Sequence, residues 1–366
     1  MATNPNKVGG KKQLTARERA KKQRKRVVLF LIEVLVLAVM VLVLVLTNKA
    51  TQMGKVQIDE EDLVFNEGVE DSTTMKGFRN IALFGVDNIS GEVPQKDDGK
   101  ARTDTIIIAS INLDTKEVKL VSVYRDTYLN IGNGQYNKAN SAYANGGFKQ
   151  AITMLNANLD LNISDFVTVG FKGMIDAIDA LGGVYIDVDS AELQHINNYQ
   201  ISITDGIGTN YTPVTETGYQ LLDGTQATAY CRIRYTAGDD FKRASRQREV
   251  IAAMAEAAKS ADISTLNKTV DEVIPNVYTS LDVDEILSLM KDLASYSIVD
   301  NTGFPFEGNI TTGRIPDKGS CVIPIDLATN VTLLHEFLFD DAAYVVSDDI
   351  VEYSGQVESQ TSPYLD

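Results

Sequence analysis

Hydrophobic residues first single out one long segment of this chain. Residues 27–46 read VVLFLIEVLVLAVMVLVLVL, in which nineteen of twenty residues are apolar and Glu33 is the exception. At about 1.5 Å per residue, a helix of this length spans the roughly 30 Å hydrocarbon core of a bilayer. The pattern therefore predicts one N-terminal transmembrane helix.

Beyond residue 76, short apolar runs alternate with patterns of helical period. Buried strands are predicted at Ile81–Val86, Thr105–Leu113 and Val118–Tyr124, which are rich in β-branched residues. Residues 148–159 and 171–181 each place apolar side chains on one helical face, and a glycine pair follows the second. This alternation predicts an α/β domain.

The second and third strands are separated by only four residues, DTKE, which is too short for a crossover. They must therefore form an antiparallel hairpin. Pairing outward from the turn places Asp126 opposite Thr105. We expect a charged corner at this end of the hairpin, where open α/β sheets tend to hold ligands. Its members are Arg102, Asp104, Arg125 and Asp126.

Charge divides the chain into a basic tail and an acidic body. Residues 1–26 carry ten Lys or Arg against one acid, and subtracting this +9 from the net charge of −16 leaves −25 for the rest. The basic run KKQRKR before the apolar segment places the N-terminus in the cytoplasm and everything after residue 46 outside the cell. A cleaved signal peptide is the alternative, although its apolar region is normally about 7–15 residues long. A nucleic-acid-binding arm is disfavoured, because anionic lipid is the nearer partner of a membrane-tethered tail.

Composition then suggests the domain organisation. Residues 1–26 form the cytoplasmic tail and 27–46 the anchor, and the polar stretch 47–76 is predicted to be an extracytoplasmic stalk. Residues 77–345 are assigned to one domain, because no linker-like segment interrupts them. The acidic end, residues 346–366, is expected to be disordered.

The densest group of cations is YCRIRYTAGDDFKRASRQRE, residues 230–249, which holds five arginines and one lysine. TAYCRIRY is predicted to be a strand that points Arg232 and Arg234 to one side. The following run is predicted to be a helix that carries Arg243, Arg246 and Gln247 on a shared face. The planar guanidinium group suits phosphate oxygens, so both halves can close on one phosphate-bearing anion. Two further cations of the helix are expected to be solvated: Lys242 and Arg248.

Other chemistries find weaker support. The sequence SLMK at 288–291 fits S-x-x-K, but no KTG or SDN motif accompanies it. The chain has two histidines, too few for a His-based zinc cluster. Cys231 and Cys321 can form a disulfide or remain reduced and buried, and the sequence leaves both open.

These segments together resemble the LytR-CpsA-Psr (LCP) family over most of residues 78–260. The motifs that carry the resemblance stand in the family's order behind the predicted single anchor. They are RTDT (102–105), SVYRDT (122–127), KANSAYANGG (138–147), FVTVGFKGMIDAIDALGGVYIDV (166–188), GYQLLDGTQATAYCRIRY (218–235) and DFKRASRQR (240–248). Tyr124 departs from the proline usual before the Arg-Asp pair, and Cys231 from an aromatic or aliphatic residue.

The resemblance implies a fold, an activity and partners. The fold is a mixed central sheet with helices on both faces. The activity is Mg²⁺-dependent transfer of a glycopolymer (wall teichoic acid, or a capsular or secondary cell-wall polysaccharide) from undecaprenyl pyrophosphate to peptidoglycan. It forms a phosphodiester link and releases undecaprenyl phosphate, with pyrophosphatase as a side activity. The implied partners are the lipid-linked glycan, the peptidoglycan acceptor and the cell membrane, with no nucleic acid.

The resemblance also implies roles for individual residues. Asp87 and Asp104 fall on the positions that hold Mg²⁺, for which Mn²⁺ can substitute. The pyrophosphate-binding positions fall on Arg102, Arg125, Lys138, Arg232, Arg234, Arg243 and Gln247, with Arg246 adjacent. Of these, Arg102 and Arg125 count as catalytic. Asp126 is a third catalytic candidate, either as the base that deprotonates the acceptor hydroxyl or as a residue that orients Arg125.

Two questions stay open on sequence alone. The same cations would serve a non-catalytic, membrane-tethered binder of polyprenyl-pyrophosphate-linked glycans, or a regulator of envelope biogenesis. An apolar channel for the lipid is expected between the sheet and its helices, because each buried CH₂ contributes about 0.8 kcal/mol. The helices at 148–159 and 171–181 are candidate walls, although ordinary core packing accounts equally for their apolar faces.

Overall fold

The computed structural model describes residues 54–55, 58, 63–69, 72–86, 101–234 and 239–365. The predicted cytoplasmic tail, the predicted transmembrane segment and Asp87 lie outside these residues. Within the described ranges, no helix is both long and apolar enough to cross a bilayer.

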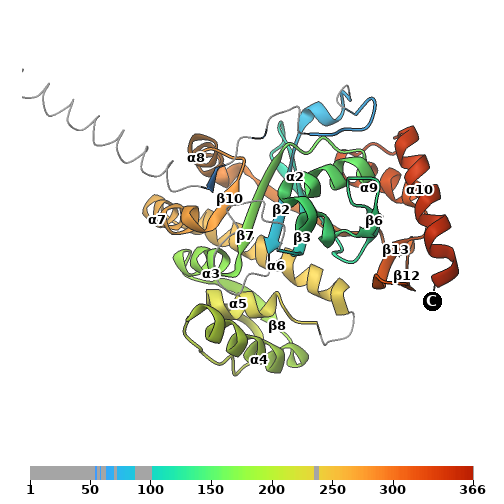
Figure 1. Cartoon of the computed structure of the whole chain (residues 1–366). Helices are drawn as coiled ribbons and strands as arrows, with labels where there is room; N and C mark the ends of the chain where they lie inside the picture. The colour runs from blue at the N-terminus through green and yellow to red at the C-terminus, as the bar shows by residue number, and fades with distance from the viewer. Residues whose placement is uncertain are drawn as a thin grey trace, which may run out of the picture. The chain divides into compact units, whose positions relative to one another are not determined.

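A seven-stranded sheet forms the centre of the domain (Figure 1), in the order β1-β10-β7-β2-β3-β4-β11. Its strands are β1 (Gly54–Lys55), β10 (Val277–Thr279), β7 (Asp165–Gly170), β2 (Phe78–Val86), β3 (Thr103–Asn112), β4 (Glu117–Val123) and β11 (Ser297–Phe304). β2, β3 and β4 pair antiparallel, whereas β7 runs parallel to β2 and β11 parallel to β4. The sheet is therefore mixed, as the family resemblance implies.

The β3–β4 hairpin is confirmed, but its register differs from the predicted one by two residues. Ile107 pairs with Ser122 and Ile111 with Val118. The side chain of Asn112 accepts hydrogen bonds from the next backbone amides, those of Asp114 and Thr115, both at 3.0 Å. The turn therefore comprises residues 113–116 and not 114–117, so the prediction that Asp126 lies opposite Thr105 is wrong.

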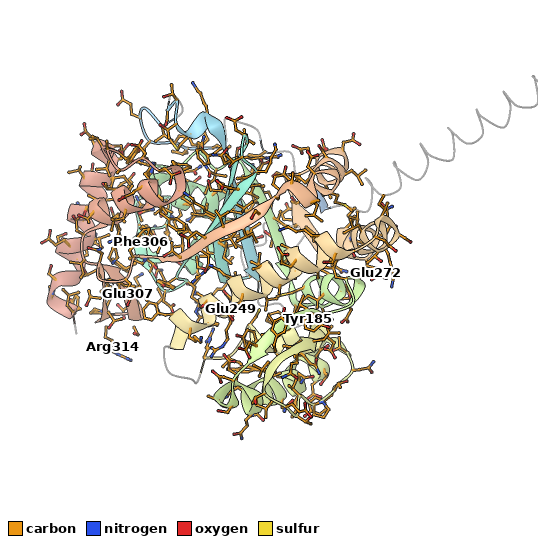
Figure 2. The ribbon with its side chains drawn as sticks, turned by 180° about the vertical axis from the view of Figure 1, so that it is seen from behind. Tyr185, Glu249, Glu272, Phe306, Glu307 and Arg314 are labelled. Carbon is orange, nitrogen blue, oxygen red and sulfur yellow. The ribbon has the colours of Figure 1, made fainter. Side chains whose placement is uncertain are left out.

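Each central strand alternates between two apolar layers. Along β3, Ile106 and Ile108 join the larger core, whereas Ile107 and Ala109 face the opposite layer. The larger core lies under the helices α2 (Asn140–Leu159), α9 (Leu327–Phe339) and α10 (Asp348–Thr361). The long helix α6 (Asp239–Ser260) crosses the other face, together with α8 (Val283–Lys291), as Figures 1 and 2 show from opposite sides.

A lobe beside the sheet has an apolar core of its own, which includes Ile178, Ile186, Leu222 and Val250. It contains α3 (Phe171–Ala180), β8 (Val184–Val188), α4 (Ser190–Ile207), β9 (Gly218–Leu222) and α5 (Gly224–Tyr230). β8 and β9 pair antiparallel. The helix α7 (Ile263–Val273) follows α6 and precedes β10.

Helix α5 corrects the strand predicted for TAYCRIRY. Asp223 and Gln226 form a capping box, in which each side chain accepts a hydrogen bond from the other's backbone amide. This cap starts a helix that ends at Tyr230, and Arg232 and Arg234 lie in the non-helical segment that follows. The sequence carries this helix start signal in LLDGTQ, and the strand prediction did not take it into account.

The acidic C-terminal end is ordered, which corrects the prediction of a disordered tail. Ser347 caps α10 by accepting a hydrogen bond from the amide of Ile350 at 3.3 Å. Ile350 and Val357 are buried, and Ser347 Oγ donates to Asp160 Oδ1 at 2.7 Å. Its apolar positions form one narrow stripe among polar residues, and composition alone hides such a stripe.

The predicted stalk is likewise part of the domain from residue 63 onward. Val69 and Met75 are buried in the larger core. Asn66 is also buried, and its side-chain amide donates to the carbonyl of Ala157 at 2.8 Å. This segment therefore packs against the end of α2, and the stalk prediction is wrong for residues 63–69 and 72–76.

Neighbouring substitutions on α10 test whether this tail stabilises the fold. Ile350 is fully buried and Val351 is 57% exposed. We expect Ile350→Ala to lower the free energy of unfolding by about 2–5 kcal/mol, because it removes buried methyl groups and leaves a cavity. Val351→Ala is the control and should change it by less than about 0.5 kcal/mol. Equal, small effects of both substitutions in urea unfolding would contradict a packed α10.

Candidate functional site

Asp104 is the extra residue of a β-bulge at the end of β2 and β3. Gly85 pairs with Thr105, and the next pair joins Val86 to Thr103. Asp104 therefore has no partner on β2, and such bulges re-aim side chains beside binding sites. A Cβ atom at Gly85 would lie 2.8 Å from the Cβ of Thr105, so glycine permits the close approach of the two strands here.

Arg125 follows β4 and lies at the centre of a charged network. Its guanidinium group pairs with the carboxylate of Asp104, and its Nε lies 3.4 Å from Asp126 Oδ2. Asp126 also holds Lys138, whose Nζ lies 3.1 Å from Asp126 Oδ1. Lys138 ends β6 (Tyr136–Lys138), which pairs with β5 (Tyr128–Asn130), so this small hairpin brings it to the corner.

Asp240, in the first turn of α6, joins the two halves of the network. One carboxylate oxygen lies 3.2 Å from Arg243 Nη1 and 3.7 Å from Arg234 Nε. The other lies 3.9 Å from Arg125 Nε, and Arg234 also reaches Asp104 at 3.5 Å. The hairpin corner and the cationic stretch thus meet, as the sequence predicts.

The electrostatics keep these groups charged. Burial alone would lower the pKa of Arg125, but the Asp104 and Asp126 carboxylates outweigh it and raise that pKa above its usual value. Burial alone would raise the pKa of Asp126, but Arg125 and Lys138 lower it below its usual value. Asp126 is therefore ionised at neutral pH and is a weak proton acceptor.

Arg243 is the least satisfied cation of the network. It is 4% exposed, and its Nε and Nη1 atoms have no hydrogen-bond acceptor among the described residues. Nη1 is near enough to Asp240 for an ion pair but lacks hydrogen-bond geometry. Burial lowers the pKa of Arg243 to about 10, so the group stays protonated at neutral pH. An anion placed beside it would recover the missing hydrogen bonds.

A cavity of about 390 Å³ opens beside these charges, and we term it the site cavity. Its polar wall consists mainly of Asp104, Arg232, Arg234, Arg243 and Gln247. Its apolar wall comes from β2, β7, α3 and α6 and includes Leu83, Val167, Val169, Met174, Ile251 and Met254. One chamber thus presents cations at one side and aliphatic side chains at the other.

Arg232 is held on the lobe side of the site cavity. Its guanidinium carbon lies 4.7 Å from the centroid of the Phe171 ring and 5.5 Å from that of Tyr199. Its Nη1 also donates to Ser202 Oγ at 3.2 Å. Aromatic faces can hold a guanidinium group without neutralising it, so Arg232 keeps its charge for a ligand.

A second cavity, of about 320 Å³, lies in the same layer between the sheet and α6 and α8. Leu83 and Ile251 line both cavities, so the two are neighbours across these side chains. Apart from Lys259 the lining is apolar or aromatic, and it includes Ala109, Leu120, Ile286, Leu289, Met290 and Ile298. Of the two predicted channel helices, residues 171–181 line the site cavity, whereas 148–159 pack in the core on the other face.

Arg246 does not join the network, which corrects the prediction that it binds pyrophosphate. The residue is fully buried, and its Nε donates to Glu192 Oε1 at 2.7 Å. Arg246 lies one residue before Gln247 and therefore about 100° away from it around the helix. Arg248, expected to be solvated, is also buried, and its Nε donates to Asn301 Oδ1 at 2.7 Å.

Two further predicted residues stand apart from the network. Arg102 is exposed and makes no ion pair with any residue that the structure describes. Asp87 lies outside the described residues, and the roles assigned to both stay predictions. The two cysteines are free and buried, so no disulfide joins them. Burial raises the pKa of Cys231 to about 12.

Sequence reasoning missed Asp240 as a site residue. It stands in the first turn of a helix, where an acidic residue is common because it suits the helix dipole. Its spacing of three residues before Arg243 was the available signal, because residues so placed on a helix can pair. The structure shows that it is the acid shared by three arginines.

A divalent-cation site made by the protein alone is not seen in the described part of the chain. No group of three or more His, Cys, Asp or Glu side chains is arranged there to hold a metal ion. Mg²⁺, however, is commonly held by one or two carboxylates together with water and substrate phosphates. Asp104 is a carboxylate in the wall of the site cavity, so its chemistry fits such an ion.

The fold and site define a class: an α/β protein in which a cationic cluster at a sheet corner opens onto an apolar cavity. The LytR_cpsA_psr family matches residues 40–317, which is more than half of the chain. The chain belongs to this family, and the resemblance seen in its motifs is confirmed.

Known proteins place the chain further within this class. It is 32% identical over 251 residues to a polyisoprenyl-teichoic acid–peptidoglycan teichoic acid transferase TagU from Oceanobacillus iheyensis, covering 66% of this chain and 68% of that protein. It is 31% identical over 227 residues to biofilm regulatory protein A from Streptococcus mutans, covering 60% of this chain but only about half, 53%, of that relative.

A solved structure shares the fold. It is the family protein YwtF (TagT) with bound octaprenyl pyrophosphate lipid, and it matches with a TM-score of 0.52 and 23% identity. The match covers 73% of this chain and 92% of the other. It confirms a mixed central sheet flanked by helices.

Proposed function

We propose that this protein transfers a glycopolymer from undecaprenyl pyrophosphate to peptidoglycan outside the cell. The polymer is wall teichoic acid or a capsular or secondary cell-wall polysaccharide. The relatives' names support a transferase of this kind. The predicted membrane anchor would hold the domain near its lipid donor.

The observation that carries the proposal is that the site cavity has a cationic wall and an apolar wall. Arg234, Arg243 and Gln247 line the same site cavity as Leu83, Val169 and Met254. A polyprenyl pyrophosphate has a dianionic head next to an aliphatic chain, so a single molecule satisfies both walls. A soluble sugar nucleotide would leave the apolar wall unused.

An acidic side chain lies among the arginines that we propose to bind the pyrophosphate. Asp240 lies among Arg125, Arg234 and Arg243 at 3.2–3.9 Å. We propose that the donor's phosphates replace part of these contacts and bring their own charge to the arginines. Phosphoryl transfer is catalysed mostly by such positioning and charge stabilisation.

The proposed reaction forms one bond and breaks one. An acceptor hydroxyl oxygen attacks the phosphorus that carries the glycan, and the bond from that phosphorus to the bridging oxygen breaks. The lipid leaves as undecaprenyl phosphate, and the glycan becomes linked through a phosphodiester. The hydroxyl proton passes to a base that we do not assign to Asp126, since Arg125 and Lys138 lower the pKa of that carboxylate and make it a weak proton acceptor. Asp126 is proposed to orient these two cations.

Mg²⁺ dependence, with Mn²⁺ as a substitute, is part of the proposal. Asp104 would hold the ion, and Asp87 is the second ligand that the family resemblance implies. When bound, the ion would neutralise charge on the pyrophosphate oxygens. Removal of divalent ions with EDTA should therefore weaken transfer.

The second cavity extends the proposed lipid site. The site cavity has the size of pockets that enclose drug-sized molecules, roughly 300–1,000 Å³, whereas an undecaprenyl chain is larger. The chain can continue past Leu83 and Ile251 into the second cavity, which is of similar volume. Each CH₂ buried there contributes about 0.8 kcal/mol to binding.

Ile251→Trp tests this continuity. The larger side chain should block the passage, so kcat/KM for an undecaprenyl donor should fall by at least about tenfold, the loss of roughly two buried CH₂ groups. A donor with a geranyl chain, which ends within the site cavity, should lose less than about twofold. Ile263→Trp is the control, because Ile263 is 78% exposed. An equal loss with both donors would contradict a continuous channel.

Direct assay tests the function itself. The full-length protein in detergent is incubated with a lipid-linked, radiolabelled glycan, peptidoglycan oligomers and Mg²⁺. The proposal expects label to enter the oligomers. If the donor binds tightly but no label is transferred, the protein is a binder of lipid-linked glycans instead.

A further inference from the structure

The Arg246–Glu192 pair is the most deeply buried ion pair among the described residues. Arg246 is fully buried and Glu192 is 2% exposed, and the contact between Nε and Oε1 is 2.7 Å. Replacing a buried ion pair by neutral residues is often harmless to stability, so such pairs contribute little net stabilisation. What this pair does for the site is therefore a separate question.

Arg246 makes a second bond that connects it to the cationic segment. Its Nη1 donates to the backbone carbonyl of Ile233 at 3.2 Å. Ile233 is fully buried and lies between Arg232 and Arg234 in sequence. The amide of Ile233 donates to the carbonyl of Tyr230 at 3.3 Å, at the adjacent helix end. The Arg246 side chain thus makes the described hydrogen bond that joins this peptide to α6.

The two neighbouring arginines leave this peptide in different directions. Arg232 extends over Phe171 and Tyr199 on the lobe. Arg234 extends to Asp104 and Asp240 at the sheet corner. A rotation of the Ile233 peptide would therefore displace both cations from the site cavity at once.

Glu192 and Tyr230 hold Arg246 itself in place. Glu192 Oε2 accepts from the Asp189 amide at 3.0 Å, which ties the carboxylate to the start of α4. The guanidinium group of Arg246 lies 5.7 Å from the ring centroid of Tyr230. The Tyr230 hydroxyl donates to Glu249 at 2.6 Å, and Figure 2 shows Glu249 on α6 beside the lobe.

We infer that Arg246 and Glu192 are positioning residues for Arg232 and Arg234. They connect α6 and α4 to the Ile233 peptide and so set where the two cations meet the pyrophosphate. Arg246 does not touch the donor. This inference rests on the proposed function, because it assigns the pair a task at the same anion site.

A charge-free variant separates this role from simple stabilisation. Arg246→Met alone leaves Glu192 buried without its partner and should unfold at a lower temperature. The double variant Arg246→Met/Glu192→Gln removes both charges, and glutamine can keep the bond to the Asp189 amide. Its thermal midpoint should return to within about 3 °C of the original protein. Transfer should nevertheless stay about tenfold lower, mainly through a higher KM for the donor.

A double-mutant cycle with Arg234→Ala gives a measurement that a purely structural role of the pair would leave unchanged. If the pair acts through Arg234, adding Arg246→Met/Glu192→Gln to Arg234→Ala should reduce transfer less than the same change does in the original protein. The two fold-reductions should differ by a factor of at least about three. Recovery of transfer together with stability, or equal costs in both backgrounds, would overturn the inference.

Farnesyl pyrophosphate binding, measured by calorimetry on the full-length protein, separates this inference from the function. If the unmodified protein transfers no glycan but binds farnesyl pyrophosphate, the proposed transfer fails, and the same variant cycle is read from affinity instead. If it binds no farnesyl pyrophosphate, both the anion site and the positioning role are wrong.

Discussion

Arg125→Ala should lower the rate of glycan transfer by about 10³-fold, the largest effect expected of a single substitution. Arg125 contacts the carboxylates of Asp104 and Asp126 and lies 3.9 Å from Asp240, so it is the common partner of three acids. Its removal would take away a proposed pyrophosphate ligand and would leave those acids to repel the donor. The measurement is single-turnover transfer at saturating donor.

Two companion variants make this result interpretable. Arg125→Lys keeps the charge but not the planar fork, and should recover only part of the activity. Arg314→Ala removes an exposed arginine of β12 (Ile310–Ile315), labelled in Figure 2, and should leave transfer unchanged. Transfer by Arg125→Ala within about threefold of the original protein would rule out this residue as a catalytic group.

Arg243→Met should make the protein more stable and far less active. The side chain is buried, and its Nε and Nη1 atoms lack hydrogen-bond acceptors among the described residues. Burial lowers its pKa to about 10, which shows that the folded protein disfavours this charge. Methionine should raise the free energy of unfolding by about 1–2 kcal/mol. Transfer should fall by about 10²-fold, because the donor loses a desolvated cation.

Arg248→Met is the matched control on the same helix. Arg248 is also buried, and its Nη1 also lacks a hydrogen-bond partner within the described ranges, but its Nε donates to Asn301 and it does not line the site cavity. The Arg248→Met variant should be less stable, because it loses that hydrogen bond. Its transfer activity should stay within about threefold of that of the original protein. If Arg243→Met instead destabilises the protein and transfers normally, Arg243 is a structural residue.

Local patterns predicted the sheet and the corner well. The β3–β4 hairpin follows from a linker too short for a crossover, and the buried strand IALFGV follows from its unbroken apolar run. The meeting of Asp104, Arg125 and Arg234 could be predicted from the sequence. Hairpin geometry and charge density each limit which charged residues can lie close together. The resemblance to a known family supplied the roles.

Other features depend on tertiary contacts that no local pattern carries. Arg246 and Gln247 are adjacent in sequence, yet one pairs with Glu192 inside the lobe and the other lines the site cavity. Which side of α6 faces the lobe is set by packing between elements distant in sequence. The narrow apolar stripe of α10 orders the helix because it packs on the core. At the start of the helix, Asp160 also accepts a hydrogen bond from the Ser347 amide. The bulge that aims Asp104 likewise needs the whole β2–β3 ladder.

The acids of the network offset the charge of a strongly cationic site. Asp104, Asp126 and Asp240 pair with its arginines at distances up to 3.9 Å. A phosphate group is a better partner than a carboxylate for several arginines at once, because it offers more acceptor oxygens. The donor therefore competes with internal acids, and binding should weaken with added salt.

Identification of the released lipid tests the central claim most directly. The full-length protein is allowed one turnover with an undecaprenyl-pyrophosphate-linked glycan and peptidoglycan oligomers, and the lipid product is weighed by mass spectrometry. Attack on the phosphorus that carries the glycan predicts undecaprenyl monophosphate, one molecule for each glycan joined to an oligomer through a phosphodiester. Release of undecaprenyl pyrophosphate would mean that the sugar–oxygen bond had broken, and would contradict a phosphotransferase.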